Sequence, residues 1–187
     1  VFVIGSAKGI KVEDNFNQKA QVTVKDAISD LPILRNGSQT NKRKYRTEPH
    51  SEYALKMRGK LQECSNNLVS YNSDEVIKRY YYIPQGGNWE NIPSILMKSY
   101  ANRFNCHTGI YHRLSLDKPS IVIGNYRKNM LIHPTQNRGL SVREAARLQS
   151  FPDNYNFCGS IGYQQQQVGN AVPPFLAHSV FAKIMKY

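Results

Sequence analysis

Cysteine is the residue type in this chain that most readily supplies a nucleophile or a metal ligand. Cys64, Cys106 and Cys158 lie far apart and form no CxxC pair, so their spacing predicts neither a zinc site nor a disulfide framework. The five histidines are equally scattered, and we expect no metal site. A lone cysteine is more often a core residue than a nucleophile, so we predict no catalytic cysteine. Unpaired cysteines fit a reducing intracellular compartment.

Basic residues are the second group that bears on function, because they indicate what the chain could bind. Lys and Arg number 25 against 13 Asp and Glu, which gives a formal net charge of +12 and a pI near 9.7. Such an excess favours a polyanionic partner such as nucleic acid. The densest run is Lys42-Arg43-Lys44-Tyr45-Arg46. Its four cations, Lys42, Arg43, Lys44 and Arg46, are candidates for phosphate contacts, and a solvated basic loop is the equal alternative.

A second set of polar residues surrounds two short apolar segments, 111–116 and 120–124, that alternate like the strands of a hairpin. An arginine side chain makes paired hydrogen bonds to guanine in the major groove, and an asparagine does so to adenine. We therefore consider six residues here as candidate DNA contacts: Arg113, Ser115, Lys118, Asn125, Arg127 and Lys128.

The segment Gly169-Asn170-Ala171-Val172 is predicted to contain a tight turn that exposes backbone. Glycine allows a close backbone approach, and the asparagine amide offers both a donor and an acceptor. We expect Gly169-Asn170 to separate two helices, the second beginning at Pro173-Pro174. The alternative role for Asn170 is to cap that final helix.

The elements that must position these residues follow from caps and periodicity. Helices are predicted where a cap precedes a periodic run: 23–31, after Ser51, 73–79, 91–100, 141–149 and 173–186. The apolar segment Val1–Gly5 is predicted to be a strand. We expect an α+β fold, with an irregular region of short strands and loops packed on a few helices.

Two long motifs carry a family resemblance. Arg138 to Asp153, RGLSVREAARLQSFPD, resembles the ninth conserved block of the DNA cytosine-5 methyltransferases. Gln167 to Pro174, QVGNAVPP, resembles the tenth and last block, and Val1–Gly5 resembles the tail of the eighth. The chain departs from the family pattern at Val122-Ile123, where a Thr and an aliphatic residue are usual, and at Gln165-Gln166, where Tyr-Arg is common.

The resemblance implies a division of the chain. Residues 1–5 would end a catalytic domain, 6–137 would be the target-recognition region, 138–160 a scaffold helix, and 161–187 a segment that returns to the catalytic domain. Gly169, Asn170, Ala171 and Val172 would then line the S-adenosylmethionine pocket. Arg143 and Arg147 either bind phosphate or pin the scaffold helix to its neighbours, and the resemblance favours the scaffold.

The resemblance also implies a reaction that this chain cannot carry out alone. The family's nucleophile is the thiolate of a Pro-Cys dipeptide, which attacks a cytosine that has been flipped out of the duplex. None of the three cysteines follows a proline, and most of the catalytic α/β sheet is expected to be absent. We expect an inactive fragment or subunit that works with an N-terminal catalytic half, in cis or in trans.

The sequence leaves other functions of the chain open. A non-catalytic basic DNA-binding module is the main alternative, and the two motifs count against it. Exposed apolar residues of 173–186 could favour a dimer of the isolated chain. No run reaches the ~20 apolar residues of a membrane span, and we expect a bacterial cytoplasmic protein of a restriction–modification system that binds double-stranded DNA.

Overall fold

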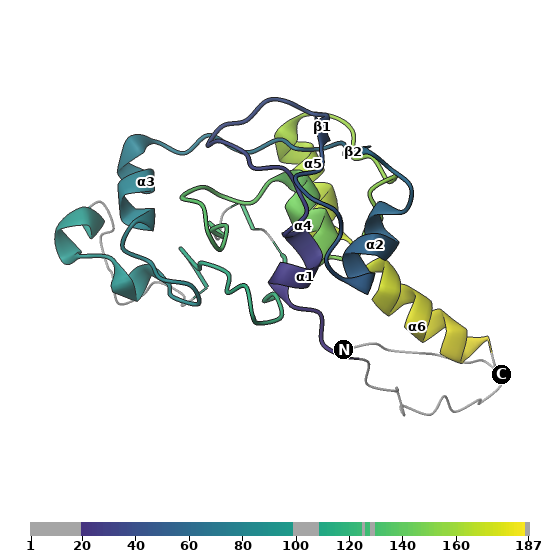
Figure 1. Ribbon diagram of the computed structural model, residues 1–187. Coiled ribbons are helices and arrows are strands. Elements are labelled where there is room, and N and C mark those ends of the chain that lie inside the picture. The colour runs from purple at the N-terminus through teal and green to yellow at the C-terminus, as the bar shows by residue number, and fades with distance from the viewer. Residues whose placement is uncertain (1–19, 99–108, 125, 128–129, 186–187) are drawn as a thin grey trace.

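The computed structural model describes residues 20–98, 109–124, 126–127 and 130–185 (Figure 1). Their fold is α+β, as expected, but helices dominate and the sheet has two very short strands. The elements in chain order are α1 (Val24–Ile28), β1 (Arg43–Lys44), α2 (Glu52–Arg58), β2 (Glu63–Cys64), α3 (Asp74–Tyr80), two 3-10 turns (Trp89–Asn91 and Ser94–Met97), α4 (Val142–Leu148), α5 (Ile161–Asn170) and α6 (Pro174–Ile184). The strand predicted at Val1–Gly5 lies outside the described residues.

Side-chain caps begin three of the helices where the sequence predicted them. The Thr23 hydroxyl accepts a hydrogen bond from Asp26 N at 3.1 Å at the start of α1. Ser51 accepts from Ala54 N at 3.0 Å and so caps α2. Before α4, the Ser141 hydroxyl accepts from Glu144 N at 3.1 Å. Each cap satisfies a backbone N–H that has no partner within its helix.

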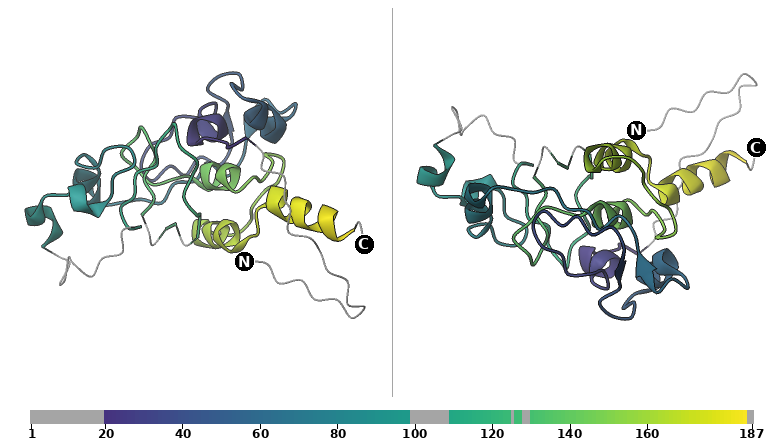
Figure 2. Two further views of the ribbon diagram at one scale, coloured as in Figure 1. Left: turned by 90° about the horizontal axis from the view of Figure 1, so that it is seen from below. Right: turned by 90° about the horizontal axis from the view of Figure 1, so that it is seen from above.

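The main core lies where α4 packs between α1 and α5, an arrangement that both views of Figure 2 show. Val142, Ala145 and Ala146 of α4 are fully buried there. Val24 of α1 and Val168 of α5 pack in the same cluster. Burial on two sides explains why Val142, Ala145 and Ala146 are small, since small side chains allow close approach of both neighbours.

A second, smaller core forms at the other end of the molecule, around α3 and the 3-10 turns (Figure 1). Its largest members are Tyr80, Tyr111 and Trp89, and the rings of Tyr80 and Tyr111 meet edge to face at 6.0 Å. The helix predicted over 91–100 is only a 3-10 turn as far as the described residues reach.

The predicted hairpin of 111–116 and 120–124 is wrong. Among the described residues neither segment forms a strand, and Arg113 instead makes an isolated parallel bridge with Ile132. The backbone carbonyls of Leu116 and Lys118 accept hydrogen bonds from the first residues of α1, Lys25 and Val24, at 2.9 Å. The alternating pattern reflects contacts with distant segments, so local pairing was not needed to satisfy the backbone.

Helix α6 projects from the main core (Figure 1) and leaves most of its apolar side chains exposed. Val180 is buried, whereas Leu176 is 43% and Phe181 64% exposed. The expectation of exposed apolar surface on this helix is confirmed, and the dimer stays a prediction. Within the described residues, no helix has the length and apolar character needed to cross a membrane.

Candidate nucleic-acid interface

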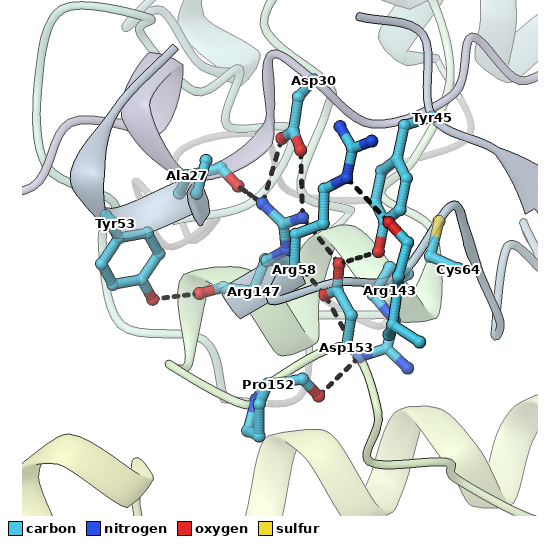
Figure 3. A network of polar contacts seen from close by, with 12 residues as sticks. Ala27, Asp30, Tyr45, Tyr53, Arg58, Cys64, Arg143, Arg147, Pro152 and Asp153 are labelled. Atoms are coloured by element: carbon cyan, nitrogen blue, oxygen red, sulfur yellow. Dashed lines mark hydrogen bonds and ion pairs between the residues drawn. The ribbon is translucent and has the colours of Figure 1, made fainter. Parts of the chain in front are cut away.

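The α4 arginines form the centre of a buried polar network (Figure 3). The Nε and Nη2 groups of Arg147 donate hydrogen bonds to the two oxygens of the Asp153 carboxylate, at 2.7 and 2.6 Å. The same guanidinium donates to Asp30 at 3.0 and 3.2 Å and to the carbonyl of Ala27 at 3.0 Å. Arg147 is therefore saturated with partners and fully buried, and these carboxylates raise its pKa.

Arg143 is also fully buried, one turn earlier on α4. It donates to the backbone carbonyls of Ser65, Pro152 and Tyr155 and to the side chain of Asn66. Neither arginine is accessible to a phosphate. The scaffold interpretation of these two arginines is confirmed.

The network also holds the basic run on the surface. The Tyr45 hydroxyl donates to Asp153 at 2.6 Å, and the Arg58 guanidinium lies 4.2 Å above the Tyr45 ring. The backbone N–H of Arg46 donates to the carbonyl of Asp30 at 2.9 Å. Tyr45 thus anchors the end of strand β1 beside α4, as Figure 3 shows.

The four cations of the run all remain exposed around that anchor: Lys42, Arg43, Lys44 and Arg46. Arg43 and Lys44 form strand β1, which pairs with Cys64 and Glu63 of β2. Lys42 makes an exposed ion pair with Glu63 at 3.4 Å, a contact that contributes little in water. We name this surface, Lys42 to Arg46, the basic strand edge.

Arg113 requires a correction, because it is not available to DNA. Only 6% of it is exposed. Its guanidinium donates to the carbonyls of Tyr80 and Ile83 at 2.7 Å and to that of His133 at 2.8 Å. The sequence correctly marked a polar position, but the structure uses it to join the second core to the loop before α4.

The remaining candidates of that set differ in exposure. Lys118 and Arg127 are exposed, and Ser115 is half-buried. Asn125 and Lys128 lie outside the described residues. The contribution of these five residues to DNA binding stays a prediction.

The candidate ligand turn lies at the end of α5 and before α6. Gly169 and Asn170 form the last turn of α5, so the break between the helices falls later than predicted, at Ala171–Pro173. The N-cap position of α6 is Pro173, and Asn170 does not cap that helix. Asn170 is exposed and Val172 is 55% exposed.

Two cavities open beside this turn. One of about 560 Å³ is lined by Gly169, Ala171 and apolar residues such as Val122 and Leu176. The other, of about 350 Å³, is lined by Gly169 and Asn170. Gln149, the C-cap residue of α4, donates to the carbonyl of Val168, just before the turn, at 2.8 Å and to that of Ile123 at 3.0 Å.

His133 belongs to a buried cluster that the sequence did not reveal. Its Nδ1 accepts hydrogen bonds from the N–H groups of Thr135 and Gln136 at 3.2 Å, and its Nε2 lies 3.6 Å from Glu144. Arg138 makes the shorter ion pair with that carboxylate, at 2.7 Å. Burial lowers the pKa of His133 to about 4.

The free energy of unfolding should therefore fall as the pH drops from about 6.5 towards 4.5. The unfolded chain takes up a proton at the ordinary pKa of histidine, whereas folded His133 stays neutral until about pH 4. We expect a loss on the order of 2 kcal/mol over this range. Urea unfolding at pH 7.5 and 4.5 measures it, and His133→Asn should reduce the slope. The same slope in wild type and His133→Asn would contradict the assignment; His112, with its pKa also lowered by burial, gives a residual slope of the same sign.

Comparison with known proteins decides the family. The family model for C-5 cytosine-specific DNA methylases matches residues 1–186. The chain belongs to this family. Residues 138–153 and 167–174, which carry the resemblance, both lie within the matched range.

Curated members of the family resemble the chain over most of its length. DNA (cytosine-5)-methyltransferase 2 of Arabidopsis thaliana is 31% identical over 188 residues, which cover 87% of this chain and 12% of that protein. The type II methyltransferase M1.HphI of Haemophilus parahaemolyticus is 37% identical over 148 residues, which cover 73% of this chain and 38% of that protein. The chain thus spans well under half the length of these relatives.

A solved structure shares the fold. It is an E. coli protein described as a DNA modification methyltransferase encoded within a prophage, and it superposes with a TM-score of 0.66. The likeness covers 88% of this chain and 47% of that one at 23% identity. At this identity it shows the fold alone.

Among the described residues, Cys64 and Cys158 are free thiols. Cys64 is buried, and burial raises its pKa to about 11, so it is protonated at neutral pH. Cys158 is exposed, and Cys106 lies outside the described residues. The part of the chain that the structure describes holds no group of three side chains suited to a metal ion.

Proposed function

We propose that these 187 residues read the target DNA and complete the S-adenosylmethionine site of a DNA cytosine-5 methyltransferase. The observation that carries the proposal is the exposed turn Gly169–Val172 with its two adjoining cavities, in a chain of this family. The Asn170 amide is free to face a ligand rather than to cap α6. When bound, S-adenosylmethionine supplies the methyl group.

The residues of the turn fit such a ligand. Gly169 lacks a side chain, so a ligand can approach its backbone closely. The Asn170 amide can both donate and accept a hydrogen bond, and the larger cavity has apolar walls from Val122 and Leu176. Gly169, Asn170, Ala171 and Val172 would together form one wall of the donor pocket.

The thiolate and most of the catalytic sheet would come from a catalytic half of the same enzyme, in cis or in trans. The exposed apolar side of α6, with Leu176 and Phe181, supports this arrangement, since a partner would remove it from water. Isolated, the chain should bind DNA but transfer no methyl group. The type II methyltransferases among its relatives support a restriction–modification role.

DNA reading is assigned to the region before α4. The basic strand edge presents four exposed cations around an anchored strand, which suits contacts to phosphates. Lys118 and Arg127 add exposed positive charge, and Ser115, Asn125 and Lys128 complete the candidate set. Phosphate contacts would position the duplex and leave base reading to other residues of the region.

Neutralising the basic strand edge tests the DNA-binding half of this proposal. Arg43→Gln with Lys44→Gln should weaken duplex binding uniformly across sequences. The slope of log K against log salt should fall by about two, because each phosphate contact contributes about 0.9. Binding is measured by fluorescence anisotropy between 50 and 300 mM salt.

The matched control removes two exposed lysines elsewhere, Lys60→Gln with Lys78→Gln, and keeps the net charge equal to that of the test variant. The control should leave the salt slope within experimental error of the wild type. Equal losses in both double variants would mean that net charge alone drives binding. That result would favour a non-specific basic DNA-binding module.

A further inference from the structure

We propose that a pocket between α1 and the loop before α4 holds one backbone phosphate of duplex DNA, with Lys25 and Arg46 as its cations. The inference rests on the proposed function, because it assigns a further phosphate contact to the same DNA-reading region. The pocket shares no residue with the donor turn. Lys25 is not among the candidate DNA contacts considered above.

The size of the pocket suits a single phosphate group. Its volume is about 140 Å³, whereas sites for small organic molecules usually enclose about 300–1,000 Å³. A whole nucleotide would therefore not fit, but one phosphate would. Ser29 and Thr135 line the pocket with hydroxyl groups, which can donate hydrogen bonds to phosphate oxygens.

The positive charge of the pocket comes from Lys25 and Arg46. Both residues line it, and both are exposed. The backbone N–H of Arg46 donates to the carbonyl of Asp30 at 2.9 Å, which holds the arginine beside the end of α1. Neither cation forms an ion pair with a carboxylate of the described residues. A phosphate can therefore accept charge-assisted hydrogen bonds from both.

The acidic side chains near the two cations are bonded to other groups. Among the described residues that line the pocket, Glu144 is the one acid. Its carboxylate accepts from Arg138 at 2.8 and 2.7 Å and from the N–H of Ser141 at 2.8 Å. Asp26 of α1 accepts from the Thr23 hydroxyl at 2.6 Å. These contacts leave the charge of the pocket to an external anion.

Hydrogen bonds fix both walls of the pocket. On one side, Nδ1 of His133 accepts from the N–H groups of Thr135 and Gln136 at 3.2 Å, which shapes the loop. On the other side, the N–H of Lys25 donates to the carbonyl of Leu116 at 2.9 Å and so holds the start of α1. The walls are thus in place before any ligand binds, which lowers the entropy cost of binding.

The surroundings of the pocket favour duplex DNA over other anions. Arg46 is also the last cation of the basic strand edge, so the pocket continues that surface towards α1. The backbone of a duplex carries regularly spaced charges and can occupy both places at once, whereas a free phosphate occupies only the pocket. Ile33 lines the pocket and is 58% exposed, so it can contact the deoxyribose beside the bound phosphate.

The first test measures binding of duplex DNA of mixed sequence to the full 187-residue chain at several salt concentrations. Lys25→Gln with Arg46→Gln should lower the slope of log K against log salt by about 0.9, because both cations hold one phosphate. The double variant of the basic strand edge removes two separate contacts and should lower it by about two. Lys60→Gln with Lys78→Gln is the control for net charge and should leave the slope unchanged.

A second test blocks the pocket without changing the charge. Thr135→Phe places a ring at the exposed edge of the pocket and should lower the slope by about 0.9. Added to Lys25→Gln with Arg46→Gln, it should lower the slope no further, because the same phosphate is already lost. Thr135→Ser retains the hydroxyl and should keep the wild-type slope. Thermal unfolding of each variant establishes that it folds like the wild type.

The outcomes separate this site from the proposed function. If Lys25→Gln with Arg46→Gln and Thr135→Phe both match their controls while the wild type binds duplex, the pocket is refuted and the proposed function stands. A fall of about two in the first variant, with no effect of Thr135→Phe, would also refute a shared phosphate. A wild type that binds no duplex overturns both proposals.

Other occupants of the pocket would give different results. If Thr135→Phe abolishes the binding of inorganic phosphate, followed by phosphorus NMR, but leaves duplex binding intact, the pocket takes a free anion and the proposal is overturned. If the pocket variants weaken assembly with the catalytic half but not duplex binding, the occupant is an acidic segment of that half. That result would overturn the proposal as well.

Discussion

Arg147→Met should lower the free energy of unfolding by about 3–5 kcal/mol, the usual cost of removing one partner from a buried ion pair. The methionine side chain would fill similar volume but would leave Asp30 buried without its cation and Asp153 with only the longer ion pair to Arg143, at 3.6 Å. It would also remove a donor from the carbonyl of Ala27. Chemical denaturation followed by circular dichroism measures the loss.

The control is Arg35→Met, which makes the same chemical change at an exposed position. It should shift stability by less than about 0.5 kcal/mol. A double variant adds Asp153→Asn to Arg147→Met, and its loss should be smaller than the sum of the two single losses, because the neutral amide no longer requires a cation. Additive losses, or an Arg147→Met variant as stable as Arg35→Met, would contradict the network described above.

Arg113→Met should loosen the second core, with an expected loss of about 2–4 kcal/mol because several buried carbonyls lose their donor at once. Those carbonyls belong to Tyr80, Ile83 and His133. Trp89, the one tryptophan of the chain, lies in that core and is 7% exposed. Its emission should shift to longer wavelength and change at lower denaturant concentration than the far-ultraviolet signal of the helices.

Two variants sharpen this prediction. Arg113→Lys keeps the charge but not the planar fork, so it should restore only a small part of the stability. Lys118→Met, at an exposed position in the same segment, should leave the Trp89 emission unchanged. A variant of Arg113 that keeps wild-type emission and stability but loses DNA binding would restore the original prediction that this side chain contacts a base.

Local sequence signals predicted the helices well, because their causes are local. The Ser141 and Glu144 pair that caps α4 needs only the four residues that it contains. The supposed hairpin near Arg113 failed for the opposite reason. Its backbone pairs with Ile132 and with α1, and an alternating pattern does not identify the partner of a strand.

The candidate site was only partly predictable. A run of four cations within five residues is too polar to bury, and Lys42 to Arg46 are exposed apart from the half-buried Tyr45. Arg113 shows the limit, since a single arginine can serve DNA or a set of carbonyls, and the sequence does not say which. Tyr45, Asp30 and Asp153 are distant in the chain, and only folding shows that they share one network with Arg147.

The most direct test of the proposed role is methyl transfer from labelled S-adenosylmethionine to mixed-sequence DNA. The chain alone should transfer nothing, and the chain combined with a folded catalytic half of the enzyme should methylate cytosine. Asn170→Ala should reduce that restored activity while leaving DNA binding unchanged. This result would separate the role of the donor turn from that of the basic strand edge. Activity from the chain alone, or silence from the combined halves when both are folded, would contradict the account.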